Sequence, residues 1–300
     1  MTPDLSARVA KAFRVRGSGT REVYFRARKV ARFFRDAERR QTLAGLGAPR
    51  FHVPREAGFL LLAPGTFDET PAIIADARAA LVQYDAAQPP QGKNRKRFLQ
   101  NVIDAAALTR DASMVRLALR EDVLVAVSRY LGVVPFLSNI FVFHSDTVDA
   151  KLTSSQLYHC DGDDITQLKL WVYCSDVDMR SGPLTVLDAE ATREVQRRTR
   201  YQFRQRLTDA QVHAIVGPSR DHPIVGPSGT TAFVDTSRCF HFGSRVQPDA
   251  PPRLAVMIQY QTPYSFMLPT GAEETLPFRR FSNPSMSRLQ RLVLGDSIAE

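Results

Sequence analysis

The sequence is poor in cysteine and has no long hydrophobic run. The 300 residues include 3 cysteines, too few to imply a disulfide framework, and this favours a reducing compartment. No unbroken apolar stretch approaches the roughly 18 residues that a membrane span needs. Hydrophobic residues make up 44% of the chain, which is too many for a disordered protein. We therefore expect a soluble globular protein in the cytoplasm.

Acidic residues are scarce at the start of the chain. Residues 1–55 carry 14 Lys and Arg against 4 Asp and Glu, so all of the basic excess behind the formal net charge of +9 lies there. Arg8 and Arg14 interrupt any apolar run that could serve as a secretory signal. We expect residues 1–50 to form a basic helical extension and residues 51–300 to form a single domain.

An apolar stripe within this extension predicts a helix. Apolar residues recur with the helical period at Val23, Ala27, Val30, Phe34 and Ala37. We expect this stripe to pack against the main domain and the arginine-rich face to be solvated. The alternative is that the basic face, within residues 8–40, binds an anionic partner such as a lipid or membrane surface or an acidic carrier protein. Nucleic acid is the least favoured partner, because basic and aromatic residues do not alternate here.

Beyond the extension, helical patterns give way to short strands. We expect a strand at residues 58–62 and a helix that begins at Pro71. A polar loop should follow at residues 91–97, and a second helix should span residues 113–131 and end at Gly132. Further strands are expected at residues 139–143, 168–174, 231–234 and 254–260, with a charged helical stretch at 189–207. Helices followed by strands and turns predict a mainly β protein with flanking helices, a β-barrel or jelly roll.

Two of the six histidines are followed two positions later by an aspartate. The two segments are His144-Ser145-Asp146 and His159-Cys160-Asp161. Chance predicts about 0.6 cases of a histidine followed two positions later by either Asp or Glu for this composition, so neither pair is strong evidence alone. In an extended segment both side chains point to one face, which lets an imidazole and a carboxylate reach the same ion. We favour the second pair, because a long strand follows it closely, and assign the first pair a structural role.

A third ligand and a cation come from later in the chain. His241 lies between two predicted strands, and Arg253 opens the second of them. Two histidines and one carboxylate on one side of an ion leave the opposite positions open, an arrangement suited to Fe(II) and O2. A nearby guanidinium could hold a dicarboxylate through paired hydrogen bonds.

Longer motifs extend this constellation. They are residues 156–164 (QLYHCDGDD), residues 167–178 (QLKLWVYCSDVD) and Gly182-Pro183-Leu184. Together with His241 and Arg253, they resemble the phytanoyl-CoA dioxygenase family, mainly over residues 135–262. The resemblance implies an Fe(II)- and 2-oxoglutarate-dependent oxygenase built on a double-stranded β-helix, a jelly roll of the cupin type with an N-terminal helical extension.

The resemblance also implies roles for individual residues. The implied iron ligands are His159, Asp161 and His241. The expected cosubstrate-binding residues are Arg253, Gln156, Lys169 and Thr185. Arg253 would bind the distal carboxylate of 2-oxoglutarate, and Gln156 and Lys169 are expected on strands that line the mouth of the barrel. The implied reaction hydroxylates an unactivated C–H bond of a small substrate, anionic or carrier-linked, and yields succinate and CO2.

These residues also have plainer interpretations. His159 and Asp161 could form a surface pair at a turn, and His241 could be a hydrogen-bonded core histidine. Arg253 could pair with Asp249 on the surface. The protein would then be a non-catalytic jelly-roll protein that binds a metal or ligand and attaches to an anionic partner through its basic N-terminal helix. A cupin-like metalloenzyme that does not use 2-oxoglutarate is a third alternative.

Overall fold

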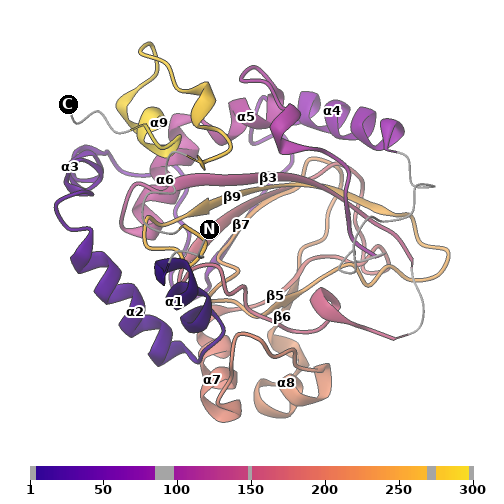
Figure 1. Ribbon diagram of the computed structural model, residues 1–300. Helices are drawn as coiled ribbons and strands as arrows, with labels where there is room; N and C mark the ends of the chain where they lie inside the picture. Colours follow the sequence, from indigo (N-terminus) through magenta and orange to yellow (C-terminus); the bar gives the residue numbers. More distant parts are fainter. Residues whose placement is uncertain (1–4, 85–97, 148–150, 269–274, 297–300) are drawn as a thin grey trace.

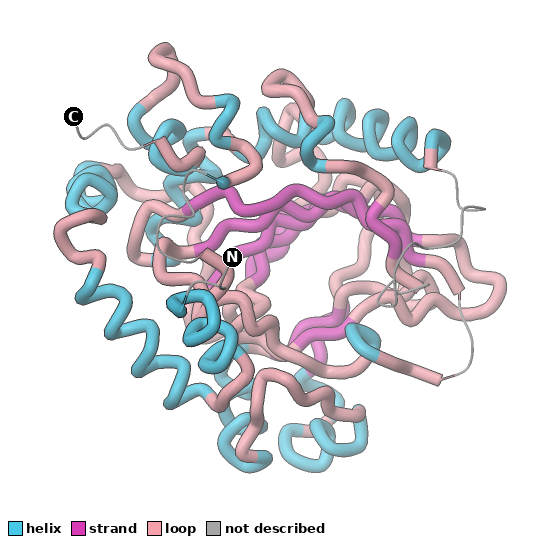
Figure 2. Tube along the Cα trace, in the orientation of Figure 1, coloured by secondary structure: helices cyan, strands magenta, loops and turns pink. Residues whose placement is uncertain are grey.

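The computed structural model describes residues 5–84, 98–147, 151–268 and 275–296. Two antiparallel sheets face each other across the middle of the molecule, and helices cover the outside (Figures 1 and 2). This two-sheet arrangement confirms the expected jelly-roll fold class. Helices, however, contribute more residues than a mainly β description implies. The polar loop expected at residues 91–97 lies outside the described ranges.

The strands form one large and one small sheet. The large sheet has the order β1 (Phe59–Leu62), β7 (Thr231–Val234), β4 (Gln167–Tyr173), β9 (Arg253–Gln261), β3 (Phe136–Ser145) and β2 (Gln100–Asn101). The small sheet has the order β6 (Asp221–Pro223), β5 (Thr185–Leu187) and β8 (His241–Phe242). The predictions for β1, β4, β7 and β9 are confirmed to within about one residue, and β3 is longer than predicted. The strands of the small sheet were not predicted, because two or three residues are too few to show an alternating pattern.

The helices lie outside the two sheets. They are α1 (Leu5–Arg14), α2 (Ser18–Ala31), α3 (Ala37–Gly45), α4 (Thr70–Gln83), α5 (Ser113–Ala118), α6 (Glu121–Leu131), α7 (Ala189–Thr199), α8 (Asp209–Val216) and α9 (Arg288–Val293). Short 3-10 turns are η1 (Ala105–Ala107), η2 (Ser154–Gln156), η3 (Pro218–Arg220) and η5 (Arg279–Phe281). Helices α4, α5, α6 and α9 cover the outer face of the large sheet and enclose the main hydrophobic core, whereas α7 and α8 lie beside the small sheet (Figure 1).

The helix predicted over residues 113–131 is divided in two. Helix α5 ends at Ala118, and Arg120 becomes the N-cap residue of α6. The Arg120 guanidinium donates to the Asp122 carboxylate in the first turn of α6 and to Glu69, which fixes the chain at the break. Gly132 ends α6 with a φ of 70°, as predicted, because the left-handed region suits glycine.

The N-terminal helix prediction is wrong about which face is buried. The chain divides into α2 and α3, and the apolar stripe faces outward: Val23 is 65% exposed, Val30 75% and Phe34 88%. Arg21 and Arg39 are buried instead. They can be buried because their N–H groups donate to backbone carbonyls and their guanidinium groups stack on aromatic rings.

The three cysteines are free and buried. Burial raises the pKa values of the Cys160 and Cys239 thiols well above their usual range, so these side chains contribute packing rather than reactivity. The free state of all three cysteines agrees with the expectation that the chain has no disulfide framework.

No helix in the described part of the chain combines the length and the apolar character that crossing a bilayer requires.

Candidate metal centre

Backbone pairing brings three distant side chains together. His159 and Asp161 lie in the loop between η2 and β4, and His241 is the first residue of β8. The backbone N–H groups of His159 and His241 each donate to the carbonyl of the other, at 3.1 and 3.0 Å. The Asp161 N–H donates to the Thr236 carbonyl at 2.8 Å. This local pairing explains why the loop and the small sheet present their side chains to one point.

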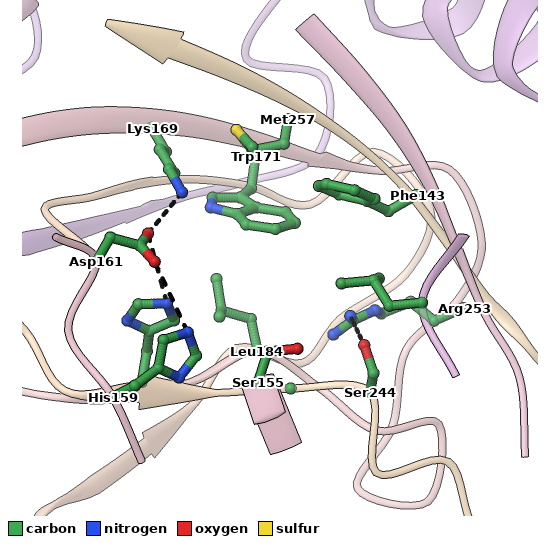
Figure 3. A pocket seen from close by; sticks show the side chains of 13 residues that line it. Phe143, Ser155, His159, Asp161, Lys169, Trp171, Leu184, Ser244, Arg253 and Met257 are labelled. Atoms are coloured by element: carbon green, nitrogen blue, oxygen red, sulfur yellow. Dashed lines mark hydrogen bonds and ion pairs between the residues drawn. The ribbon is translucent and has the colours of Figure 1, made fainter. Parts of the chain in front are cut away.

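The ligand atoms of these residues converge. One nitrogen or oxygen from each of His159, Asp161 and His241 lies within 4.8 Å of the others. His159 Nε2 lies 3.7 Å from Asp161 Oδ1, and His241 Nε2 lies 3.8 Å from Asp161 Oδ2 (Figure 3). Each Nδ1 faces a carbonyl oxygen, of Leu157 at 2.9 Å and of Cys239 at 3.1 Å. Because the Nδ1–H groups donate to these carbonyls, both Nε2 lone pairs are directed toward the shared space.

The protonation states of the three groups suit a cation. Burial lowers the pKa of both His159 and His241, so both imidazoles are neutral near pH 7. Burial acts to raise the pKa of Asp161, but the positive charge of the Lys169 ammonium, 2.6 Å away, outweighs it and holds that pKa well below its usual range. Two neutral imidazoles and one ionised carboxylate are the donor set that a divalent transition metal requires. Both imidazoles are buried, which excludes the surface-pair interpretation.

A buried guanidinium lies at the other end of the same pocket. Arg253, the first residue of β9, is 2% exposed and donates to the Gly182 carbonyl at 2.6 Å and to the hydroxyls of Ser145 and Ser244. Its Nε has no hydrogen-bond partner among the described residues. The expected alternative, an ion pair with Asp249 on the surface, is wrong, because the described partners of this buried side chain are a carbonyl and two hydroxyls.

The pocket between these two ends is small and largely apolar. Its volume is about 140 Å³. Its apolar walls come from Leu99, Phe143, Trp171, Leu184 and Met257 (Figure 3). Lys169 and Trp171 point to the same face of β4, as their spacing predicts. The site therefore combines a candidate metal-ligand set, a fixed cation and hydrophobic walls in one pocket.

Gln156, Thr185 and His144 lie elsewhere. The prediction that Gln156 lies on a strand is wrong: it belongs to the 3-10 turn η2, where its side chain completes a capping box and donates to the Ser244 carbonyl at 2.9 Å. Thr185 is buried in β5. Neither residue is among those that line the pocket, and neither is His144 of β3. No sequence pattern pointed to Ser145 and Ser244, because a lone serine carries no spacing signal.

Comparisons with known proteins find likenesses among solved structures alone. No protein-family model matches the chain, and no curated protein matches it. Three similar structures are the non-heme alpha ketoglutarate dependent epimerase SnoN from nogalamycin biosynthesis, HygX from Streptomyces hygroscopicus with nickel and 2-oxoglutarate bound, and EctD from S. alaskensis with 2-oxoglutarate and 5-hydroxyectoine.

These likenesses are distant. Identity is 18% with SnoN, 19% with HygX and 14% with EctD, at TM-scores of 0.46, 0.45 and 0.49. Each alignment covers 69% of this chain, and 79%, 83% and 73% of SnoN, HygX and EctD respectively. At such values the likeness assigns no reaction to this chain, and membership of the phytanoyl-CoA dioxygenase family stays an expectation.

Proposed function

We propose that this protein is an Fe(II)- and 2-oxoglutarate-dependent oxygenase that hydroxylates an unactivated C–H bond of a small substrate. One observation carries the proposal. The Nε2 atoms of His159 and His241 and the Asp161 carboxylate meet in a pocket whose far end holds the buried guanidinium of Arg253. A three-ligand set with open positions beside a fixed cation suits a metal that must also bind a dicarboxylate.

In this proposal the protein binds and orients the reacting groups. His159, Asp161 and His241 hold the iron, which when bound supplies O2 activation coupled to the conversion of 2-oxoglutarate into succinate and CO2. Arg253 takes the distal carboxylate of 2-oxoglutarate through charge-assisted hydrogen bonds. Ser244 keeps the guanidinium in place at 3.0 Å.

Lys169, Gln156 and Thr185 act less directly. Lys169 donates to one Asp161 oxygen at 2.6 Å, which leaves the other oxygen for the metal and holds the carboxylate in one orientation. Gln156 acts at one remove, since it donates to the backbone carbonyl of Ser244, whose hydroxyl contacts Arg253. A contact between Thr185 and the cosubstrate stays a prediction.

The walls of the pocket indicate the kind of substrate. Phe143, Trp171 and Met257 offer an apolar surface to the part of the substrate that carries the C–H bond. Trp171 Nε1 is buried without a hydrogen-bond partner in the described structure, so it is available to a polar group of a bound molecule. A volume of about 140 Å³ limits what enters to a small molecule or to one end of a larger, carrier-linked one.

The basic extension gives less support to an anionic partner than its composition implies. Arg21, Arg28 and Arg39 are buried and donate to carbonyl oxygens of other segments. Their charges are therefore used inside the molecule. The alternative of a non-catalytic binder attached through this extension then depends on the basic residues that stay exposed, such as Arg26 and Lys29.

Anaerobic addition of Fe(II) and 2-oxoglutarate tests the proposal. We expect a weak visible charge-transfer band in the wild type, followed by succinate formation when O2 is admitted. The band should be absent in His241→Ala and retained in His144→Ala, a matched control because His144 lies outside the pocket. A wild type without the band, or an unchanged band in His241→Ala, would contradict the proposal.

A further inference from the structure

Two adjoining hollows lie between the start of α2 and helix α7, outside the metal centre. The first has a volume of about 400 Å³ and the second about 620 Å³. Ser18, Arg193 and Gln196 line both, and the Ser18 hydroxyl donates to the Gln196 side chain at 2.9 Å. The two helices meet at this point in the lower part of Figure 1.

Arginines surround the hollows, and several are not neutralised. Arg16 and Arg200 line the second hollow, and Arg193 lines both. None of these three side chains has a hydrogen-bond or ion-pair partner in the described part of the chain. Glu22 is the one carboxylate among the lining residues, and it already pairs with Arg26 at 2.9 Å. Arg16, Arg193 and Arg200 therefore give the hollows a positive charge that no ion pair among the described residues offsets.

A buried hydroxyl without a partner lies in the wall of the first hollow. Ser237 is 2% exposed, and its Oγ has no hydrogen-bond partner among the described residues. Its backbone N–H donates to Asp235, so only the hydroxyl is unsatisfied. Buried polar groups in proteins are nearly always paired, so the unpaired hydroxyl of a residue that lines the hollow is a donor that a bound polar group can satisfy.

The start of α2 supports the same sign of charge. Gly17 is its N-cap residue and supplies no side-chain cap, and Ser18, Gly19 and Thr20 line the second hollow. The first backbone N–H groups of a helix have no partner within the helix and attract anions. They add neutral donors to the guanidinium groups on the opposite side.

We propose that these hollows bind a phosphate group of an anionic ligand. Donors approach from three directions: the guanidinium groups of α7, Arg16 before α2, and the Ser237 hydroxyl. A phosphate presents several oxygens in a tetrahedral arrangement and can accept from several such donors at once, whereas a planar carboxylate is satisfied by a single guanidinium. The site is separate from the metal centre and does not depend on its chemistry.

Isothermal titration of the full chain with inorganic pyrophosphate tests this site. We expect saturable binding to the wild type, at least about tenfold weaker binding by Arg193→Ala, and a smaller loss in Ser237→Ala. Arg198→Ala is the matched control, because it removes the same charge from α7 but lines neither hollow. Acetate at the same concentration should not compete.

Vesicles distinguish a free phosphate ligand from a lipid headgroup. Binding to phosphatidic acid vesicles that Arg193→Ala abolishes, without binding of pyrophosphate, assigns the phosphate to a lipid. Pyrophosphate binding that Arg193→Ala weakens assigns it to a free ligand. The proposal is overturned if neither probe binds, or if Arg198→Ala weakens binding as much as Arg193→Ala. Fe(II) affinity should be unchanged in Arg193→Ala, so failure here leaves the oxygenase proposal standing.

Discussion

The candidate metal centre and the N-terminal helices both bury ionisable side chains, but the hydrogen bonds of these side chains are satisfied differently. Arg21 and Arg39 direct their N–H groups at backbone carbonyls and stack on aromatic rings, so their charge is fully used within the fold. His159 and His241 satisfy only Nδ1 and direct Nε2 into a pocket. Burial of an ionisable side chain therefore does not by itself identify a functional site. The difference lies in which atoms are left facing empty space.

Removal of one ligand should have the largest effect. We expect His241→Ala to weaken Fe(II) binding at least about 100-fold, because two ligands cannot replace three. Equilibrium dialysis under anaerobic conditions measures this. His144→Ala should retain wild-type affinity, and equal losses in the two variants would remove the distinction between the pocket histidines and an ordinary histidine.

Loss of the Arg253 guanidinium should weaken 2-oxoglutarate binding and leave metal binding unchanged. In Arg253→Ala the 2-oxoglutarate concentration needed for half-maximal succinate formation should rise at least about 30-fold, because the distal carboxylate of 2-oxoglutarate loses its guanidinium partner. Fe(II) affinity, measured by dialysis, should stay near the wild-type value. An unchanged 2-oxoglutarate requirement would refute the role given to Arg253.

Substitution of a satisfied arginine should affect stability rather than chemistry. Arg39 donates to the carbonyls of Val134, Pro135 and Leu292. Arg39→Met should lower the free energy of unfolding by about 2–3 kcal/mol, because the buried carbonyls of Val134 and Pro135 lose the guanidinium donor and Leu292 keeps only the Gly295 N–H. Urea denaturation followed by circular dichroism measures this loss. A free energy of unfolding close to that of the wild type would mean that water donates to these carbonyls in the variant.

Asp164 should make stability depend on pH. Burial raises the pKa of Asp164 to about 7, although its carboxylate accepts hydrogen bonds from Thr262 and Ile165. Between the ordinary aspartate pKa and about 7, the folded state therefore holds a proton that the unfolded chain has released. The free energy of unfolding should fall as pH rises through this window, by at most about 1.4 kcal/mol per pH unit.

A titration of stability against pH tests this sign. Asp164→Asn should flatten the dependence between pH 4 and 7, because it carries no ionisable group. Stability that rises with pH in the wild type over the same interval would show that the carboxyl is ionised in the folded state.

The smallest effect is expected on the exposed stripe. Val30 is 75% exposed and Phe34 88%, so Val30→Ser and Phe34→Ser should each change the free energy of unfolding by no more than about 0.5 kcal/mol. Urea denaturation again provides the measurement. A loss comparable to that in Arg39→Met would mean that the stripe is covered in solution.

The sequence located the core of the candidate site better than its supporting residues. His159 and Asp161 were predictable because their spacing places them on one face, and His241 because it lies between two strands. Ser145 and Ser244 could not be found, since Ser145 meets Arg253 only when β3 and β9 pair, and Ser244 reaches it from the loop after β8. Gln156 was misplaced because a single turn of 3-10 helix leaves no periodic pattern.

The fold prediction failed at the N-terminal helices, where two faces share the helical period and either could be buried. Val23, Val30 and Phe34 follow the helical period, and so do Arg21, Arg28 and Arg32 on the other face. Sequence alone favours burial of the apolar stripe. The actual outcome depends on carbonyl oxygens supplied by remote loops, which are known only after the chain has folded.

Anomalous diffraction from crystals loaded with Fe(II) in the absence of O2 tests the central claim most directly. The account predicts one ion within about 2.0–2.3 Å of His159 Nε2, His241 Nε2 and an Asp161 oxygen. An ion bound instead by His144 and Asp146, or the absence of any ion between the two buried imidazoles, would contradict it.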